Sequence, residues 1–114
     1  MQELDLFYLQ LEEPGKSYLL SVRTHILNYD EEMTEAWKFN MPFFLYKGNK
    51  ICYFRLDQKS GLYYIGFNDG KWIDHPKLTF EKRSRIKIFT LDPAVDLPIE
   101  VLNSILKMAT GLYD

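Results

Sequence analysis

The chain of 114 residues has little of several residue types that catalytic and metal sites usually need. Its single cysteine, Cys52, excludes an internal disulfide and any metal site built from several thiolates. The two histidines, His25 and His75, have no sequence spacing typical of a metal pair or a catalytic triad. No stretch around the glycines matches a phosphate-binding loop. We therefore expect a protein that is not an enzyme.

Long hydrophobic runs are also missing. No apolar stretch approaches the roughly 20 residues that a helix needs to cross a bilayer. The first residues, MQELDLFYLQ, begin with acidic side chains and lack the basic start of a signal peptide. These absences, together with the lone cysteine, predict a cytoplasmic protein without a membrane partner.

What the sequence does contain is a large share of core-forming residues. Hydrophobic residues make up 46% of the chain and aromatic residues 16%, which is typical of a packed globular protein. A chain of this length supports one ordinary core, so we expect a single domain over residues 1–114.

The net charge of −2 hides an uneven distribution. Residues 1–36 contain eight acidic and two basic residues, whereas residues 37–91 contain eleven basic and four acidic ones. Residues 92–114 are acidic again, with four acidic residues and one basic. Such a pattern is typical either of a charged partner or of acidic and basic layers that pack on one another.

Hydrophobic periodicity predicts helices at both ends of the chain. Apolar residues spaced three and four apart indicate helices over residues 2–12 and 14–28 and, beginning at Pro98, over residues 98–109. Asp30 is a plausible cap for a short third helix over residues 31–37.

Between these helices the period changes to two. Strands are expected over residues 41–47, 50–56, 62–68 and 85–91, with Gly48-Asn49 as a two-residue hairpin turn. That turn would place Phe44 and Tyr46 on one sheet face with Tyr53 and Arg55. The opposite face would carry Phe43, Leu45, Cys52, Phe54 and Leu56. The expected fold is a two-layer α+β sandwich, in which N-terminal and C-terminal helices cover one face of an antiparallel sheet of four to five strands.

The order of these segments resembles the YdhG-like family of small, largely uncharacterised bacterial domains. The residues that carry the resemblance are Trp37, Met41, Pro42, Phe44, Tyr46, Lys47, Gly48, Cys52, Phe54, Gly66, Phe67, Arg85, Ile86 and Lys87. The resemblance covers nearly the whole chain, although residues 68–83 share only their position with the family. It implies a frataxin-like fold and, because some members are described as iron chaperones, a possible role in binding iron.

An iron site would need oxygen ligands, and the acidic residues before the first strand could supply them. The candidates are Asp30, Glu31, Glu32 and Glu35, with Glu31 and Glu35 one turn apart on the expected short helix. The alternative is a solvated helix end whose acidic residues favour the positive end of the helix dipole.

The second candidate site is the sheet face that the helices do not cover. Phe44, Tyr46, Tyr53 and Arg55, with Arg85 and Lys87 nearby, could bind a small ligand or a protein partner; nucleic acid is disfavoured by the negative net charge. Alternatively, this face is covered by residues 68–82 or by a second subunit. The run from Glu81 to Lys87 holds four basic residues and could bind a phosphate or a carboxylate, but alternation along a charged edge strand explains it equally well.

Overall fold

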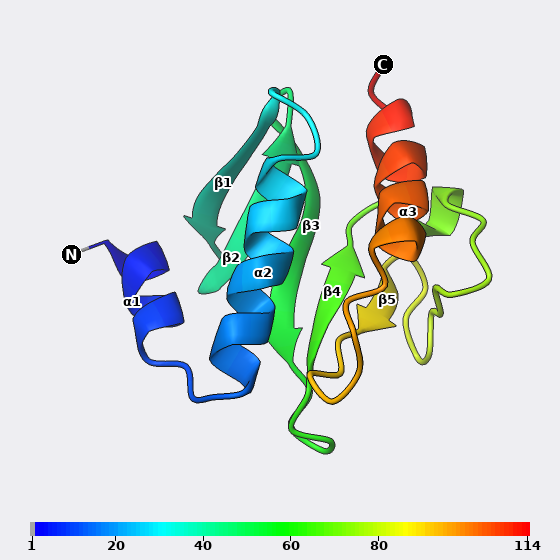
Figure 1. Cartoon of the computed structure of the whole chain (residues 1–114). Helices are drawn as coiled ribbons and strands as arrows, with labels where there is room; N and C mark the ends of the chain where they lie inside the picture. The colour runs from blue at the N-terminus through cyan, green and yellow to red at the C-terminus, as the bar shows by residue number, and fades with distance from the viewer. Residues whose placement is uncertain (1) are drawn as a thin grey trace.

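The computed structural model describes residues 2–114 and has the expected α+β architecture. Three α-helices, α1 (Glu3–Leu9), α2 (Gly15–Leu27) and α3 (Ile99–Gly111), accompany five strands. The strands are β1 (Met33–Lys38), β2 (Met41–Tyr46), β3 (Asn49–Leu56), β4 (Tyr63–Phe67) and β5 (Lys87–Thr90). They form one antiparallel sheet in sequence order, and α2 and α3 lie on the same side of it (Figure 1). We call the side that carries the helices the inner face and the opposite side the outer face.

The inner face holds the main core because both long helices turn an apolar stripe toward it. Leu19, Val22 and Ile26 recur every three or four residues along α2 and are buried. The corresponding stripe of α3 consists of Leu102, Ile105, Leu106 and Ala109. These side chains pack on inward-pointing strand residues, namely Phe44, Cys52, Phe54, Ile65 and Phe67.

The predicted short helix over residues 31–37 was wrong, because this segment forms strand β1. The Asp30 side chain accepts a hydrogen bond from the Glu32 backbone N–H (2.8 Å), which makes a turn and not a helix start. From Met33 onward the segment pairs along its whole length with β2. Cross-strand pairing therefore outweighs the local helix preference of Glu, Met and Ala, and the sheet has five strands.

The predicted register of the β2–β3 hairpin was also wrong. The turn lies at Lys47-Gly48, whose backbone φ angles of 51° and 80° are the left-handed pair of a two-residue hairpin turn. Tyr46 therefore faces Asn49, and an irregularity between Phe44 and Leu45 then brings Phe43 opposite Tyr53. Gly48 occupies the second turn position, where its missing side chain permits a positive φ.

The long connection between β4 and β5 packs mainly on the inner side of the sheet. It contains a short 3-10 helix, η1 (Gly70–Trp72), and its Ile73 and Leu78 belong to the main core. Residues 68–82 therefore do not form the cover of the outer face that we considered from the sequence. None of the helices within residues 2–114 combines the length and the apolar character that a bilayer crossing requires.

Candidate functional site

The outer face of the sheet carries a small aromatic cluster with its own packing. Phe43, Tyr53 and Tyr64 from three neighbouring strands pack with Ile88 and are separate from the main core. Ring centroids lie 5.1 Å apart between Phe43 and Tyr53 and 6.5 Å apart between Tyr53 and Tyr64. Such distances are typical of favourable aromatic pairs, each worth about 0.5–1.5 kcal/mol beyond area burial.

Phe39 extends this row of rings to four. Its centroid lies 5.9 Å from that of Phe43, yet 72% of Phe39 is exposed. Phe39 and Asn40 form the two-residue turn between β1 and β2, with φ angles of 52° and 60°. A phenylalanine at positive φ is uncommon and costs about 1 kcal/mol or more. The turn thus holds an exposed ring over the outer face at an energetic cost, which marks it as a candidate contact residue.

Basic side chains lie over both ends of the row. The ammonium of Lys50 is 5.3 Å from the Phe39 ring centroid, and the Arg83 guanidinium is 5.2 Å from that of Tyr64. Arg83 also donates a hydrogen bond to the Tyr64 hydroxyl (3.2 Å). Both cations are within the range in which an aromatic ring attracts positive charge.

The strand positions on the outer face carry basic charges and no acidic ones. Lys38, Lys50 and Arg55 lie opposite the outer-face residues Met41, Leu45 and Tyr64 in the strand register. Directly paired residues in antiparallel strands point to the same face. Glu35, the one acidic residue within the five strands, points to the inner side and pairs with Arg23 of α2. The outer face is therefore an aromatic surface rimmed by positive charge.

Of the six residues predicted for the ligand face, the structure brings only Tyr53 and Arg55 together there. Phe44 and Tyr46 belong to the main core on the inner side, because the irregularity between Phe44 and Leu45 pairs Phe44 with Cys52 and not with Tyr53. The Tyr46 hydroxyl donates to the Asp114 carboxylate (2.6 Å), which also accepts from Lys47 (3.1 Å).

The two basic residues before and within β5 are engaged elsewhere. Arg85 donates to the Asp69 carboxylate (2.6 Å), and Lys87 donates to the Ile73 backbone carbonyl (2.7 Å). Lys87 alternates with Ile88 along β5, so it lies away from the outer cluster. Neither residue joins Tyr53 and Arg55.

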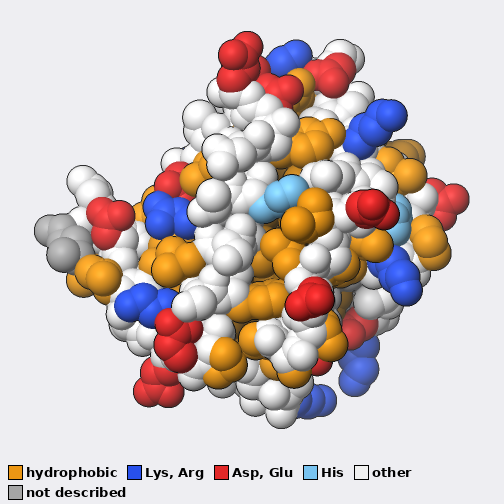
Figure 2. Space-filling model, in the orientation of Figure 1, with side chains coloured by type: hydrophobic (Ala, Val, Ile, Leu, Met, Phe, Trp, Pro, Cys, Tyr) orange, Lys and Arg blue, Asp and Glu red, His pale blue; other side chains and the backbone are white. Residues whose placement is uncertain are grey.

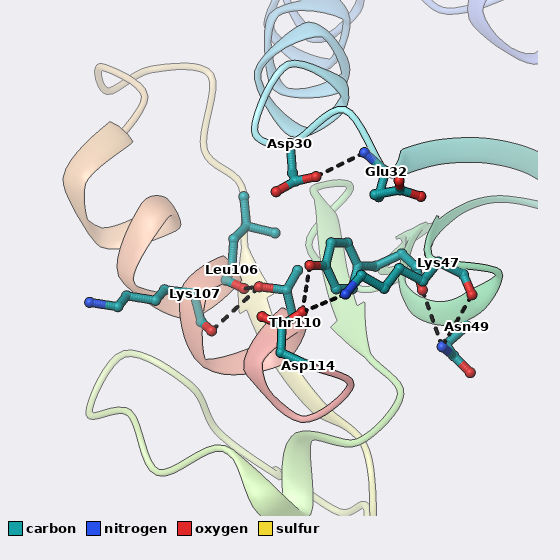
Figure 3. A network of polar contacts seen from close by, with 9 residues as sticks. Asp30, Glu32, Lys47, Asn49, Leu106, Lys107, Thr110 and Asp114 are labelled. Carbon is teal, nitrogen blue, oxygen red and sulfur yellow. Dashed lines mark hydrogen bonds and ion pairs between the residues drawn. The ribbon is translucent and has the colours of Figure 1, made fainter.

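The predicted metal ligands are divided between a turn and a strand. Asp30, Glu31 and Glu32 lie on the turn between α2 and β1, where Glu31 and Glu32 are exposed. Figure 3 shows Asp30 and Glu32 on this turn, near Lys47 and Asp114. Glu35 lies farther along β1 and accepts two hydrogen bonds from the Arg23 guanidinium, at 2.9 and 2.7 Å.

Some of these carboxylate oxygens have partners within the chain. The Arg23 guanidinium occupies both Glu35 oxygens, and an Asp30 oxygen accepts the Glu32 N–H. Within residues 2–114, no group of three His, Cys, Asp or Glu side chains is arranged so that it could hold a metal ion.

The two histidines tie segments to α3. His25 Nε2 lies 2.6 Å from the Asn103 side-chain oxygen, and His75 Nε2 lies 2.8 Å from the Ser104 hydroxyl. The second pair resembles a serine–histidine dyad, but its hydrogen bonds oppose that use. The Lys77 backbone N–H donates to His75 Nδ1, so the proton of neutral His75 resides on Nε2. Ser104 in turn donates to the Val101 carbonyl (2.8 Å), and His75 therefore has no lone pair to accept the serine proton.

Cys52 has no features of a reactive thiol. It is completely buried, and burial raises the pKa of its thiol. A protonated thiol among apolar side chains behaves as a small hydrophobic residue.

Sequence reasoning missed most of the outer cluster: Phe39, Phe43, Lys50, Tyr64 and Arg83. Phe43 was missed because the irregularity between Phe44 and Leu45 brings it opposite Tyr53, and a change of the turn to Lys47-Gly48 alone would have left it opposite Cys52. Phe39-Asn40 also stands between two strand-like segments with a hairpin spacing. The position of Arg83 depends on how residues 79–86 fold, for which the sequence has no local pattern.

Comparison of the chain with protein-family models, with curated protein sequences and with solved structures found no match.

Proposed function

We propose that this protein is a non-catalytic binding domain whose outer sheet face binds an acidic segment of a partner protein. The observation that carries the proposal is the combination of a four-ring aromatic row with strand positions that are basic and never acidic. Charge complementarity between a basic rim and an acidic partner accelerates encounter and excludes wrong partners. The exposed ring of Phe39, at one end of the row, supplies apolar contact area.

The burial of the rings favours a protein partner over a nucleic acid. Single-stranded nucleic acids bind by stacking bases on open ring faces. Phe43, Tyr53 and Tyr64 are only 3%, 5% and 6% exposed, so Phe39 alone presents a free ring. A second copy of the chain is disfavoured as the partner, because the same face would bring Lys38, Lys50 and Arg55 against like charges.

Membership in the YdhG-like family and a cytoplasmic location belong to the same proposal. The two-layer fold of two N-terminal helices, a five-stranded sheet and a C-terminal helix supports the resemblance. The single cysteine, buried as a free thiol, supports a reducing compartment.

Iron handling, which the resemblance implies, has less support than partner binding. Of its four predicted ligands, Glu35 has both oxygens and Asp30 has one oxygen engaged within the chain. An anaerobic Fe(II) titration followed by backbone amide shifts would test it. Saturable amide shifts clustered at Glu31 and Glu32 would support iron binding, and the absence of such shifts would contradict it.

The test of the main proposal measures binding of a short peptide of alternating Glu and Phe residues. We expect Lys50→Glu combined with Arg55→Glu to weaken binding by about tenfold or more, since two attractive rim charges become repulsive. Raising the salt concentration should weaken wild-type binding, because exposed charges are screened over about 10 Å at 0.1 M salt. Backbone amide shifts should locate the peptide on β2, β3 and β4.

The matched control is Lys71→Glu combined with Lys77→Glu, which changes net charge equally at exposed positions of the β4–β5 connection. Equal weakening by both pairs would mean that net charge alone attracts the peptide and would contradict the proposal. Tighter binding of a single-stranded oligonucleotide than of the peptide would replace the protein partner by a nucleic acid.

A further inference from the structure

A cavity lies at the end of the molecule opposite the α2–β1 turn, away from the outer face. It is open to solvent on one side, has a volume of about 630 Å³ and is bordered by three connections. These are the α1–α2 connection, the β3–β4 loop and the segment after β5, which meet at the lower end of Figure 1. A volume of this size is ordinary for a small-molecule site, which typically spans about 300–1,000 Å³.

The walls of this cavity are apolar and aromatic. Tyr18 of α2 and Tyr63 of β4 contribute two rings. The aliphatic part of the lining consists of Leu11, Pro14, Leu19, Leu62, Leu91, Pro93 and Ala94. Burial raises the pKa of both tyrosines, and the nearby Asp92 carboxylate raises that of Tyr18 further. The rings are therefore neutral at physiological pH, and neutral aromatic rings attract cations.

All charged residues that line the cavity are acidic. They are Glu12, Glu13 and Asp92, and the described lining includes no Lys, Arg or His. Lys16 is the neighbouring base; it lies near Glu13. Asp92 accepts the Ala94 backbone N–H through one carboxylate oxygen (2.9 Å), which leaves the other oxygen for a ligand. Figure 2 shows acidic side chains beside hydrophobic ones at this lower end.

The start of α2 also borders the cavity, but it does not make an anion site. Two of its backbone N–H groups are occupied within the chain, since Lys16 N donates to the Glu12 carbonyl (2.9 Å) and Ser17 N to the Glu13 carboxylate (2.8 Å). The Ser17 hydroxyl donates to the other Glu13 oxygen (2.6 Å). Glu13 thus caps the helix, and Glu12 and Asp92 remain as the carboxylates available to a ligand.

From this arrangement we propose that the cavity binds an organic cation, an alkylammonium group with an apolar body. The aliphatic and aromatic walls take the hydrocarbon part, and Glu12 and Asp92 pair with the ammonium. The ammonium can come from a free amine or from a lysine side chain of another protein, since the two share the same chemistry. This site is independent of the outer face.

The test compares three ligands of one shape that differ only in the charge of the head group. Hexylammonium, hexanol and hexanoate are titrated separately, and backbone amide shifts are followed at Tyr18, Leu62, Leu91 and Asp92. We expect hexylammonium to bind at least about tenfold more tightly than hexanol, because a hydrogen bond between an ammonium and a carboxylate is stronger than one made by a neutral hydroxyl. Hexanoate should give no saturable shifts at these residues. Equal binding of hexylammonium and hexanol, or tighter binding of hexanoate, would overturn the proposal.

A substitution then tests whether the Asp92 carboxylate supplies the negative charge that binds the ammonium. Asp92→Asn keeps an oxygen that can accept the Ala94 N–H, so the segment should fold as before, while hexylammonium binding should weaken by about tenfold. Glu100→Gln, at an exposed position in the first turn of α3 and outside the cavity, is the matched control and should bind as the wild type does. Unchanged binding by Asp92→Asn would also overturn the proposal.

A last comparison separates the two sources of the cation. Nα-acetyl-lysinamide is titrated beside a short peptide with one central lysine in a glycine–serine background. Equal affinity supports the cavity as a site for a free amine. Tighter binding of the peptide supports it as a site for a lysine side chain.

Discussion

At the scale of single residues, the partner of a side chain decides what that side chain does. Glu31 and Glu35 have the same chemistry and were predicted to act together. Glu31 is exposed on a turn, whereas Glu35 forms a two-point ion pair with Arg23, whose guanidinium lies 4.3 Å from the ring centroid of Tyr8. The Tyr8 hydroxyl is buried without a hydrogen-bond partner, and burial raises its pKa. Glu35 therefore stabilises the inner layer.

This difference gives the first stability prediction. Glu35→Gln should lower the free energy of unfolding by about 1–2 kcal/mol, between the values for exposed and buried ion pairs, because both side chains are only 21–23% exposed. Glu31→Gln is the matched control and should change it by less than about 0.5 kcal/mol. Chemical denaturation measures both. Equal losses in the two variants would contradict the structural role of Glu35.

At the scale of elements, the outer face depends on one glycine. Gly66 of β4 lies opposite Tyr53 of β3 in the strand register. A methyl group built on Gly66 would overlap the ring of Tyr53, so the ring occupies the space that any other residue would fill. The absence of a side chain at Gly66 is what allows the Tyr53 ring to lie against β4, between Phe43 and Tyr64.

We accordingly expect Gly66→Ala to destabilise the protein by about 1–3 kcal/mol, the usual range for overpacking a filled site. The cost should fall in a Tyr53→Leu background, where no ring meets the added methyl group. Denaturation of the two single variants and the double variant gives the coupling energy. Strictly additive losses would show that Tyr53 and Gly66 do not share that space.

At the scale of the whole molecule, Asp69 connects three segments that are distant in sequence. It lies after β4 and accepts hydrogen bonds from Arg85, just before β5, and from the Tyr113 hydroxyl, after α3. The hydrogen bond from Arg85 is the main reason that the pKa of Asp69 is lowered, and the one from Tyr113 contributes next. The carboxylate thereby joins the β4–β5 connection to the C-terminal helix.

The pKa of Asp69 is lower in the folded state than in the unfolded state. The stability that its charge contributes is therefore fully present at a pH above the unfolded-state pKa, and it is lost as the pH falls through the folded-state pKa. Asp69→Asn should reduce the free energy of unfolding by about 1 kcal/mol at neutral pH, a modest value because solvent screens the 68%-exposed Arg85. The difference between the wild type and Asp69→Asn should shrink below about pH 4. Denaturant titrations from pH 7 to pH 2, a range around the carboxyl pKa, measure it.

Tyr113→Phe is the matched control for this connection, because it removes one hydrogen bond and leaves the Arg85 ion pair in place. Its loss of stability should be smaller than that of Asp69→Asn. If the difference in unfolding free energy between the wild type and Asp69→Asn stays constant across the acidic range, the Asp69 charge does not contribute to stability.

The sequence by itself determined the fold class, the three helices α1, α2 and α3 and the strands β2 to β5. These elements have strong local signals: an apolar stripe on each helix, and period-two segments separated by Gly and polar turn residues. The burial of Cys52 and its place among apolar side chains also followed from alternation along the strand. Local propensity and tertiary packing agree at these positions.

Only the tertiary structure decided the character of the two candidate sites. The register irregularity between Phe44 and Leu45, at which Ile51 of β3 has no partner, put Phe44 and Tyr46 on the core face with Cys52 and separated them from Tyr53 and Arg55, since side chains alternate with a period of two. Pairing with β2 made a strand of a segment whose residues favour a helix, and so separated Glu35 from Glu31. The cavity bordered by Tyr18, Tyr63 and Asp92 is formed by three connections whose meeting has no local signal. Contacts between distant segments fix these features, and their physical cause is therefore not contained in any single stretch of sequence.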